Sequence, residues 1–274
     1  MMKPRIIAII QARMASSRLP GKVLLDIAGR PMLAHVVLRT RQAKTVDQVV
    51  VATTIEADDD PVAVYCARQG YLCYRGSQHD VLDRYYQAAR IFGAEVVVRI
   101  TADCPLIDPT VIDKTVLAFL GQEPKAEAFP DVTDANGFPY DFAANRLPPP
   151  WGRTYPIGLD TEVCTFSALE RAWKEADQPY QREHVMPYLY EQQGRFRVRM
   201  VNHEVDYGDL RWTVDTAEDL KLVRKLFAHF PGREDFSWLE VLEVFEREAN
   251  LRQINAQVHH KNVHDVDPRG GSQA

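Results

Sequence analysis

The sequence has no uninterrupted run of roughly 18 apolar residues, so it offers no segment long enough to cross a bilayer as a helix. Its opening residues have an apolar part too short for a secretion signal and show no small-residue cleavage site, so we expect a cytoplasmic protein without a membrane partner. Cysteine is scarce: there are four, with no C-x-x-C pair. This scarcity excludes a disulfide-stapled scaffold and favours reduced thiols.

Positively charged residues are also fewer than negatively charged ones. The formal net charge is −5, whereas a domain that binds duplex nucleic acid is usually basic, so we expect no nucleic-acid partner. The two common phosphate-binding motifs, G-x-x-x-x-G-K-[ST] and G-x-G-x-x-G, are absent as well. Any nucleotide site in this chain must therefore be built differently.

Apolar strands and amphipathic helices alternate along the first half of the 274 residues. Continuously apolar strands between helices indicate a mostly parallel sheet that is covered on both faces, which is a Rossmann-like three-layer α/β fold. The expected strands are 5–11, 48–54, 71–76 and 95–101, and the expected helices are 31–43, 58–70, 80–93 and 108–121.

The middle of the chain differs in composition. Residues 134–160 are rich in proline, glycine and aromatics and show no helical period, so we expect an ordered insert at about 130–165 that covers a substrate pocket or a dimer interface. Helices are expected again at 166–176, 181–194 and 235–251, with a strand at 196–203 and a strand, turn and helix over 211–230. We therefore expect one domain over 1–252 and a polar C-terminal tail at 253–274.

The most distinctive local feature is the stretch "RMASSRLPGK", which follows the first expected strand. It carries Arg13, Arg18 and Lys22, with serine hydroxyls between them and Gly21 to permit close backbone approach. Guanidinium and ammonium groups that converge after a strand suit a triphosphate. A solvated charged loop is the alternative interpretation, and the spacing alone does not decide between them.

Two aspartates, Asp103 and Asp215, each follow an expected strand. Ligands of open α/β sheets bind beyond the carboxyl ends of the strands, so both carboxylates are expected in one crevice. Two such carboxylates can share Mg²⁺, which prefers oxygen ligands. The alternative is that each aspartate caps a helix, as the Asp108-Pro109 pair is expected to do.

The stretch "ARMASSRLPGK" resembles the opening of the cytidylyltransferases that make CMP-activated acid sugars, the CMP-KDO and CMP-sialic acid synthetases. The resemblance is closest to the spore-coat polysaccharide (SpsF-like) branch. It extends through "DVLDRYYQAA", "VVVRITADCPLIDP", "YPIGLDTEV", "REHVMPYLY" and "RWTVDTAEDLKLV", from about Ile6 to Leu226. It implies the nucleotidyltransferase version of the three-layer fold, which is glycosyltransferase-A-like.

The resemblance also implies roles for the matching residues. Asp103 and Asp215 would hold Mg²⁺, with Mn²⁺ as a substitute, and would be catalytic together with Arg13 and Lys22. The segment around Gly76 departs from the "SGTDR" form of the KDO enzymes, which weakens the inference of strict CTP preference. The residues implied in nucleotide binding are Gln11, Ala12, Arg13, Ser16, Arg18, Lys22, Gly76, Ser77, Asp83 and Arg84.

The reaction implied is transfer of CMP from CTP to an anionic acceptor, an acidic sugar, with release of pyrophosphate, in a homodimeric enzyme. We expect Arg182 to hold the acceptor anion, with Arg153 as a competing candidate. The further candidates for acceptor binding are Asn145, Tyr155, Asp160, Glu162 and His184. Two alternatives remain open: a phosphorylated or phosphonate acceptor, and a nucleotide-binding module without turnover.

Overall fold

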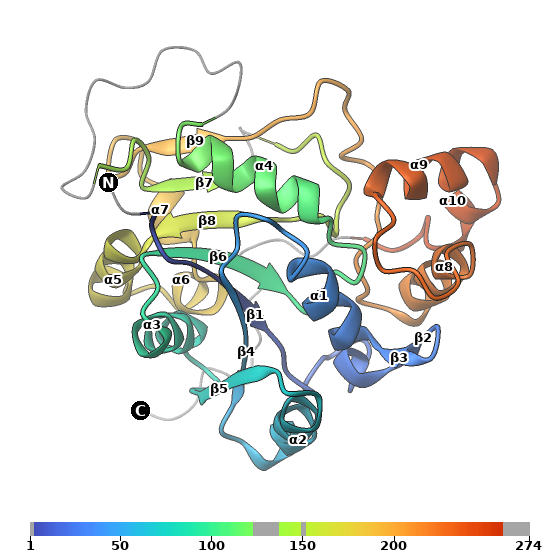
Figure 1. Cartoon of the computed structure of the whole chain (residues 1–274), viewed down its shortest axis with the longest axis horizontal. Coiled ribbons are helices and arrows are strands. Elements are labelled where there is room, and N and C mark those ends of the chain that lie inside the picture. Colours follow the sequence, from blue (N-terminus) through green and yellow to red (C-terminus); the bar gives the residue numbers. More distant parts are fainter. Residues whose placement is uncertain (1–2, 123–136, 149–151, 260–274) are drawn as a thin grey trace.

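The computed structural model describes residues 3–122, 137–148 and 152–259, and its centre is a seven-stranded sheet (Figure 1). The strand order is β5-β4-β1-β6-β8-β7-β9. Strand β8 (Glu162–Thr165) runs antiparallel to both of its neighbours, β6 (Val96–Thr101) and β7 (Phe142–Ala144), while the other neighbouring pairs are parallel. The remaining strands of this sheet are β1 (Ile6–Gln11), β4 (Gln48–Thr54), β5 (Leu72–Gly76) and β9 (Val198–Met200).

Helices cover both faces of the sheet, so the molecule has the three layers predicted from the sequence. In β1, Ile6, Ala8 and Ile10 face one apolar core, and Ile7 and Ile9 face the other, because successive side chains of a strand alternate. The first core is closed by α1 (Met32–Thr40), α2 (Asp60–Gln69), α4 (Pro109–Phe119), α8 (Ala217–Phe227) and α9 (Trp238–Arg247), and the second by α3 (Val81–Phe92), α5 (Phe166–Glu175) and α7 (Pro187–Tyr190).

The helix expected over 181–194 is divided in two. Helix α6 (Pro179–His184) ends before Val185, which has a left-handed φ of +71°, and α7 starts at Pro187. Proline lacks an N–H and its ring clashes with the preceding turn, so α6 cannot continue through this position. The continuous helix was therefore a wrong prediction.

The predicted insert contributes strands to the main sheet. Strands β7 and β8 lie inside it, although the proline- and glycine-rich composition around them indicated no strand. Its aromatic side chains Phe138, Phe142 and Tyr155 are buried within the chain's own cores, so they are not displayed for a partner. Residues 130–136 and 149–151, which include Trp151, lie outside the described residues.

The C-terminal segment stays attached to the domain beyond residue 252. Helix α10 (Leu251–Ile254) is followed by Asn255, whose amide nitrogen donates to the Arg211 carbonyl at 3.1 Å and to Asp219 Oδ1 at 2.9 Å. Residues 260–274 of the predicted tail lie outside the described residues. None of the helices in residues 3–122, 137–148 and 152–259 is both long and apolar enough to span a membrane.

Candidate active site

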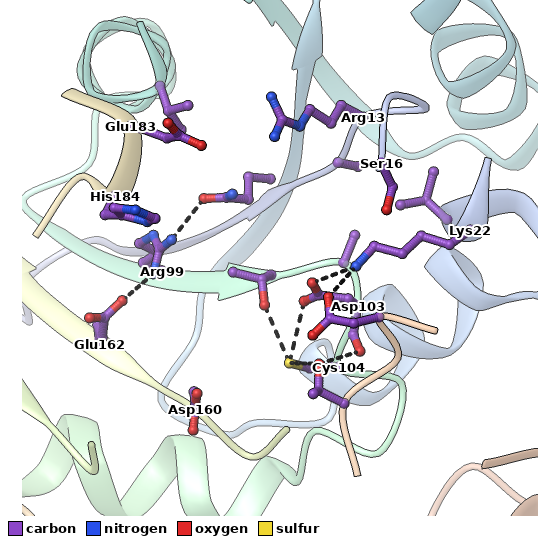
Figure 2. A pocket seen from close by; sticks show the side chains of 18 of the residues that line it. Arg13, Ser16, Lys22, Arg99, Asp103, Cys104, Asp160, Glu162, Glu183 and His184 are labelled. Atoms are coloured by element: carbon purple, nitrogen blue, oxygen red, sulfur yellow. Dashed lines mark hydrogen bonds and ion pairs between the residues drawn. The ribbon is translucent and has the colours of Figure 1, made fainter. Parts of the chain in front are cut away.

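A cleft of about 650 Å³ opens where β1 and β6 end (Figure 2). Gln11 and Thr101, the last residues of these two parallel strands, line it, and so does Glu162, the first residue of the reversed strand β8. The crevice therefore lies at the sheet edge where the alternation of strands and helices placed it. It contains twelve of the predicted site residues: Gln11, Ala12, Arg13, Ser16, Arg18, Lys22, Arg84, Asp103, Asp160, Glu162, His184 and Asp215.

The basic loop between Arg13 and Lys22 has a defined shape. The N–H of Gly21 donates to the Met14 carbonyl at 2.8 Å, and the N–H of Met14 donates to Asp59 Oδ1 at 2.6 Å. Gly21 has a φ of +70° and leads directly into the short 3₁₀ helix η1 (Lys22–Leu24). Asp59 is almost fully buried, so the loop is anchored to the domain rather than solvated as a free charged segment.

Lys22 joins the two aspartates. Its Nζ lies 2.9 Å from Asp103 Oδ2, 2.9 Å from Asp215 Oδ1 and 2.9 Å from the Val214 carbonyl oxygen. Burial disfavours the charged form of Lys22, but Asp103 and Asp215 together raise its pKa above the ordinary value. The two carboxylates thus converge on a single point in the cleft. Only Asp103 follows a strand of the sheet: residues 212–214 form no strand, and Arg211 makes only an isolated bridge with Ile157, so the strand expected before Asp215 was a wrong prediction.

Asp215 is surrounded by cations. Its Oδ2 lies 2.9 Å from Arg18 Nη2 and accepts a hydrogen bond of 2.7 Å from Arg211 Nη2. Burial acts to raise its pKa, yet Lys22, Arg18 and Arg211 hold the carboxyl pKa well below its usual range. It is therefore a carboxylate at any physiological pH.

Asp215 is not a helix cap, so the capping interpretation of this residue was wrong. Thr216 is the N-cap of α8, and it forms a capping box with Asp219. Asp219 is fully buried and also accepts the N–H of Asp215 at 3.0 Å, which fixes the backbone that carries the cleft carboxylate. Asp108, in contrast, caps α4 as predicted, since its side chain accepts the N–H groups of Thr110 and Val111.

Cys104, next to Asp103, is a buried thiol. Its Sγ lies 3.3 Å from Thr101 Oγ1 and 3.6 Å from Asp103 Oδ1. Burial, followed by the negative charge of Asp103, raises the thiol pKa well above its ordinary value. The thiolate is the nucleophilic form of cysteine, so this environment disfavours a nucleophilic Cys104 and suits a packing role.

The opposite end of the cleft is built around Arg99 of β6 (Figure 2). Arg99 Nη1 pairs with Glu162, and Arg99 Nη2 donates to Gln11 Oε1 at 3.0 Å. Its Nε is buried and has no hydrogen-bond partner among the residues that the structure describes. Asp160 lines the same end and is bound by Arg153 at 2.8 Å. This end therefore mixes cationic and anionic groups, unlike the basic loop.

Gly158 lets the strand-like segment before Asp160 approach residues 212 and 213. It has a φ of +111°, and an added Cβ would lie 2.7 Å from the Thr213 nitrogen and 2.8 Å from the Trp212 carbonyl carbon. Residues that carry a side chain rarely adopt this backbone conformation, and a Cβ this close to other backbone atoms would force the backbone to shift. Close packing at Gly158 thus places Asp160 in the cleft.

We expect Gly158→Ala to lower the free energy of unfolding by more than about 3 kcal/mol, because strain and overlap add. Gly152→Ala is the matched control: Gly152 has a φ of +74°, but its added Cβ would have no atom of the described residues, apart from its own chain neighbours, within 4 Å. The control should lose only about 1 kcal/mol in urea denaturation. Equal losses in the two variants would show that the close approach has no energetic weight.

Three of the predicted nucleotide residues do not line the cleft. Asp83 accepts a hydrogen bond of 2.8 Å from Trp173 Nε1 and so ties α3 to α5. Gly76 packs against Arg84, since an added Cβ would lie 3.2 Å from Arg84 Cγ. The carbonyl of Ser77 accepts a hydrogen bond of 2.5 Å from Arg84 Nη1. Gly76 and Ser77 therefore position Arg84, which does reach the cleft.

Three of the predicted acceptor-binding residues do not line the cleft and instead bind other parts of the protein. Arg182 pairs with Asp80, with Nη2 and Oδ2 2.5 Å apart, and thereby stabilises the start of α3 instead of lining the cleft. Asn145 is fully buried and bonds the backbone of residues 159 and 161. Tyr155 is buried, and its hydroxyl accepts from Lys114 Nζ at 3.0 Å.

Sequence reasoning missed several residues that line the cleft. The clearest is Arg99, and the available signal was a charged residue inside the otherwise apolar strand "VVVRIT". Glu183 lies next to the predicted His184 on a short helix, and nothing in the local pattern distinguished it. The polar residues missed are Arg99, Thr101, Arg146, Glu183, Tyr190 and Thr213.

The donor set suits a divalent metal that is also bound by phosphate. Asp103 and Asp215 offer two carboxylates that already converge on one cation, and hard oxygen ligands are those that Mg²⁺ and Mn²⁺ prefer. No cluster of three or more His, Cys, Asp or Glu side chains with metal-binding geometry occurs within the described ranges. Magnesium commonly uses one or two carboxylates together with substrate phosphates, and this pair fits that arrangement.

The fold and the cleft define a nucleotidyltransferase, and comparison with known proteins names the family. A family profile described as "Cytidylyltransferase" matches residues 7–261, so the chain belongs to the cytidylyltransferase family. An uncharacterized protein of Methanocaldococcus jannaschii is 36% identical over 265 residues, which is 96% of this chain and 99% of that protein. The spore coat polysaccharide biosynthesis protein SpsF of Bacillus subtilis is 31% identical over 88% of this chain and 94% of its own length.

Solved structures agree with this assignment. A cytidylyltransferase from Leptospira borgpetersenii is 32% identical with a TM-score of 0.80, covering 94% of this chain and 100% of that one. A CMP-KDO synthetase solved with CTP has a TM-score of 0.56 over 82% of this chain and 99% of that one, at 20% identity, which shows the shared fold. The resemblance drawn from the sequence is confirmed.

Proposed function

We propose that this chain transfers CMP from CTP to an anionic acceptor, an acidic sugar, and releases pyrophosphate, in the synthesis of a surface polysaccharide or glycoconjugate. The observation that supports this most strongly is the convergence of Asp103 and Asp215 on Lys22, beside the basic loop, in a single cleft. A module that only bound nucleotide would not need two carboxylates at this point. The similar SpsF and CMP-KDO synthetase proteins support the acidic-sugar acceptor.

The site residues form two groups along the cleft, one at the basic loop and one around Arg99 (Figure 2). Arg13, Arg18 and Lys22 hold the triphosphate and stabilise the charge that develops on the departing pyrophosphate. The acceptor hydroxyl bonds to the α-phosphorus as the bond to the bridging oxygen breaks, and the hydroxyl proton is released. Mg²⁺ or Mn²⁺ held by Asp103 and Asp215 would supply positive charge at the α-phosphate.

In this proposal, the acceptor binds at the end of the cleft where Arg99 lies. Arg182 is held by Asp80, so we assign the acceptor anion to Arg99, which lines the cleft and whose Nε has no hydrogen-bond partner within the described ranges. Arg146 is a second cation at this end and lies 3.9 Å from Asp160 Oδ2. Glu162 and His184 offer hydrogen-bonding groups for sugar hydroxyls.

The phosphate role of the loop is tested by Arg18→Ala. Removing a charged hydrogen-bond donor should weaken CTP binding by about 1.5–3 kcal/mol in isothermal titration calorimetry. Arg30→Ala is the control, because Arg30 is an exposed arginine outside the cleft. If single alanine variants of Arg13, Arg18 and Lys22 all keep the wild-type CTP affinity, the loop does not bind phosphate.

The choice of nucleotide is tested by pyrophosphate release with CTP, UTP, ATP and GTP against acidic sugars and phosphorylated polyols. We expect release with CTP and an acidic sugar. Efficient use of a phosphorylated or phosphonate acceptor would favour that alternative. The predicted homodimer and the cytoplasmic location, where CTP is made, stay proposals; light scattering on the purified protein measures the former.

A further inference from the structure

The ammonium group of Lys22 occupies the point where the two cleft carboxylates meet. Its three N–H donors are matched by three oxygens, from Asp103, Asp215 and the Val214 carbonyl, all at 2.9 Å. Its side chain is only 11% exposed. The position between Asp103 and Asp215 is thus already filled by a cation that belongs to the protein.

The cations around Asp215 are of two kinds. Arg211 is fixed, since Asp219 accepts from both its Nε at 3.0 Å and its Nη2 at 3.1 Å while Arg211 also binds Asp215. Lys22 and Arg18, in contrast, come from the basic loop to which the proposed function assigns the triphosphate. The same two side chains therefore have two sets of anionic partners, the carboxylate oxygens and the phosphate oxygens.

We propose that Lys22 is an exchangeable cation, which holds Asp103 and Asp215 in place in the nucleotide-free protein and thereby keeps its affinity for Mg²⁺ or Mn²⁺ low. This inference rests on the proposed function, because it takes the triphosphate as the ligand that draws Lys22 and Arg18 away. A like charge a few ångströms away disfavours a second cation at the same carboxylates. Nucleotide and metal then bind cooperatively, and each raises the affinity of the protein for the other by the same factor.

The test uses Mn²⁺ alone, without nucleotide, and measures free Mn²⁺ by electron paramagnetic resonance. We expect weak binding to the wild-type protein and binding about ten- to a hundredfold tighter to Lys22→Met, which keeps the aliphatic stem and removes the charge. Lys22→Arg retains a cation, so its Mn²⁺ binding should stay as weak as that of the wild-type protein. The double variant Lys22→Met/Asp103→Asn should lose the gain, because one of the two carboxylates is gone.

A second measurement shows whether Lys22→Met is folded and tests its metal binding independently. In a thermal unfolding experiment without nucleotide, Mn²⁺ should raise the Tm of Lys22→Met and leave that of the wild-type protein unchanged. The proposal is overturned if Lys22→Met binds Mn²⁺ no more tightly than the wild type, or if Asp103→Asn does not affect the gain. A failure of the proposed function is recognised separately, by the absence of CTP binding to the wild-type protein in calorimetry.

Discussion

Asp103→Asn should reduce kcat by about 100- to 1000-fold while the protein stays folded. The Asp103 side chain contacts only Lys22 and the Cys104 thiol among the hydrogen bonds and ion pairs found in the described part of the chain, so its loss disturbs little of the structure. It does remove one of the two charges to which we assign the divalent cation, and electrostatic groups of this kind are usually worth that much in the transition state. Pyrophosphate release measures the effect.

Asp26→Asn is the matched control for charge removal, because Asp26 is exposed and does not line the cleft. Circular dichroism should show the same fold for both variants. Wild-type turnover by Asp103→Asn, or full turnover by the wild-type protein in EDTA, would contradict the shared-metal mechanism.

The second large effect concerns the acceptor. Arg99→Met leaves Glu162 buried without its partner, which destabilises a fold strongly, so the informative variant is Arg99→Met/Glu162→Gln. Loss of a buried charge that pairs with substrate is worth roughly 2–5 kcal/mol, so the KM for the acceptor should rise at least about thirtyfold. The KM for CTP should change little, because the basic loop is untouched.

Arg182→Met is the control for this variant. The Arg182 guanidinium is bound to Asp80 and to the carbonyl of Trp173, so its loss should lower stability and leave the acceptor KM unchanged. The opposite outcome, a raised KM in Arg182→Met and none in the Arg99 variant, would move the acceptor out of the Arg99 end of the cleft.

The end of the cleft that carries the basic loop was predictable from the sequence because local patterns indicate it. Strands β1 and β6 are apolar and continuous, so their carboxyl ends were evident. Arg13 and Asp103 each follow such an end by two residues, and Lys22 belongs to the same basic loop as Arg13. Because parallel strands present their carboxyl ends at one edge of the sheet, these residues were predicted to lie in one crevice. The pairing of Lys22 with both aspartates is tertiary and had no local signal.

The end of the cleft around Arg99 was less predictable because its residues depend on how separate segments pack. Strand β8 is four residues long and reversed, and it brings Glu162 to the cleft from its first position instead of its last. Arg182 stood at the start of an expected long helix, but the break at Val185 and the pairing with Asp80 give it a structural role. Such pairings between distant segments leave no periodic pattern in the sequence.

The central claim is tested most directly by identifying the products of the wild-type protein incubated with CTP, Mg²⁺ and a panel of acidic sugars. Phosphorus-31 NMR distinguishes a sugar-linked CMP phosphodiester from CTP and from free CMP. We predict one equivalent of pyrophosphate for each equivalent of CMP joined to an acidic sugar, and none with neutral sugars. Transfer to a neutral sugar as the best acceptor, or hydrolysis of CTP to free CMP with every acceptor, would contradict the account.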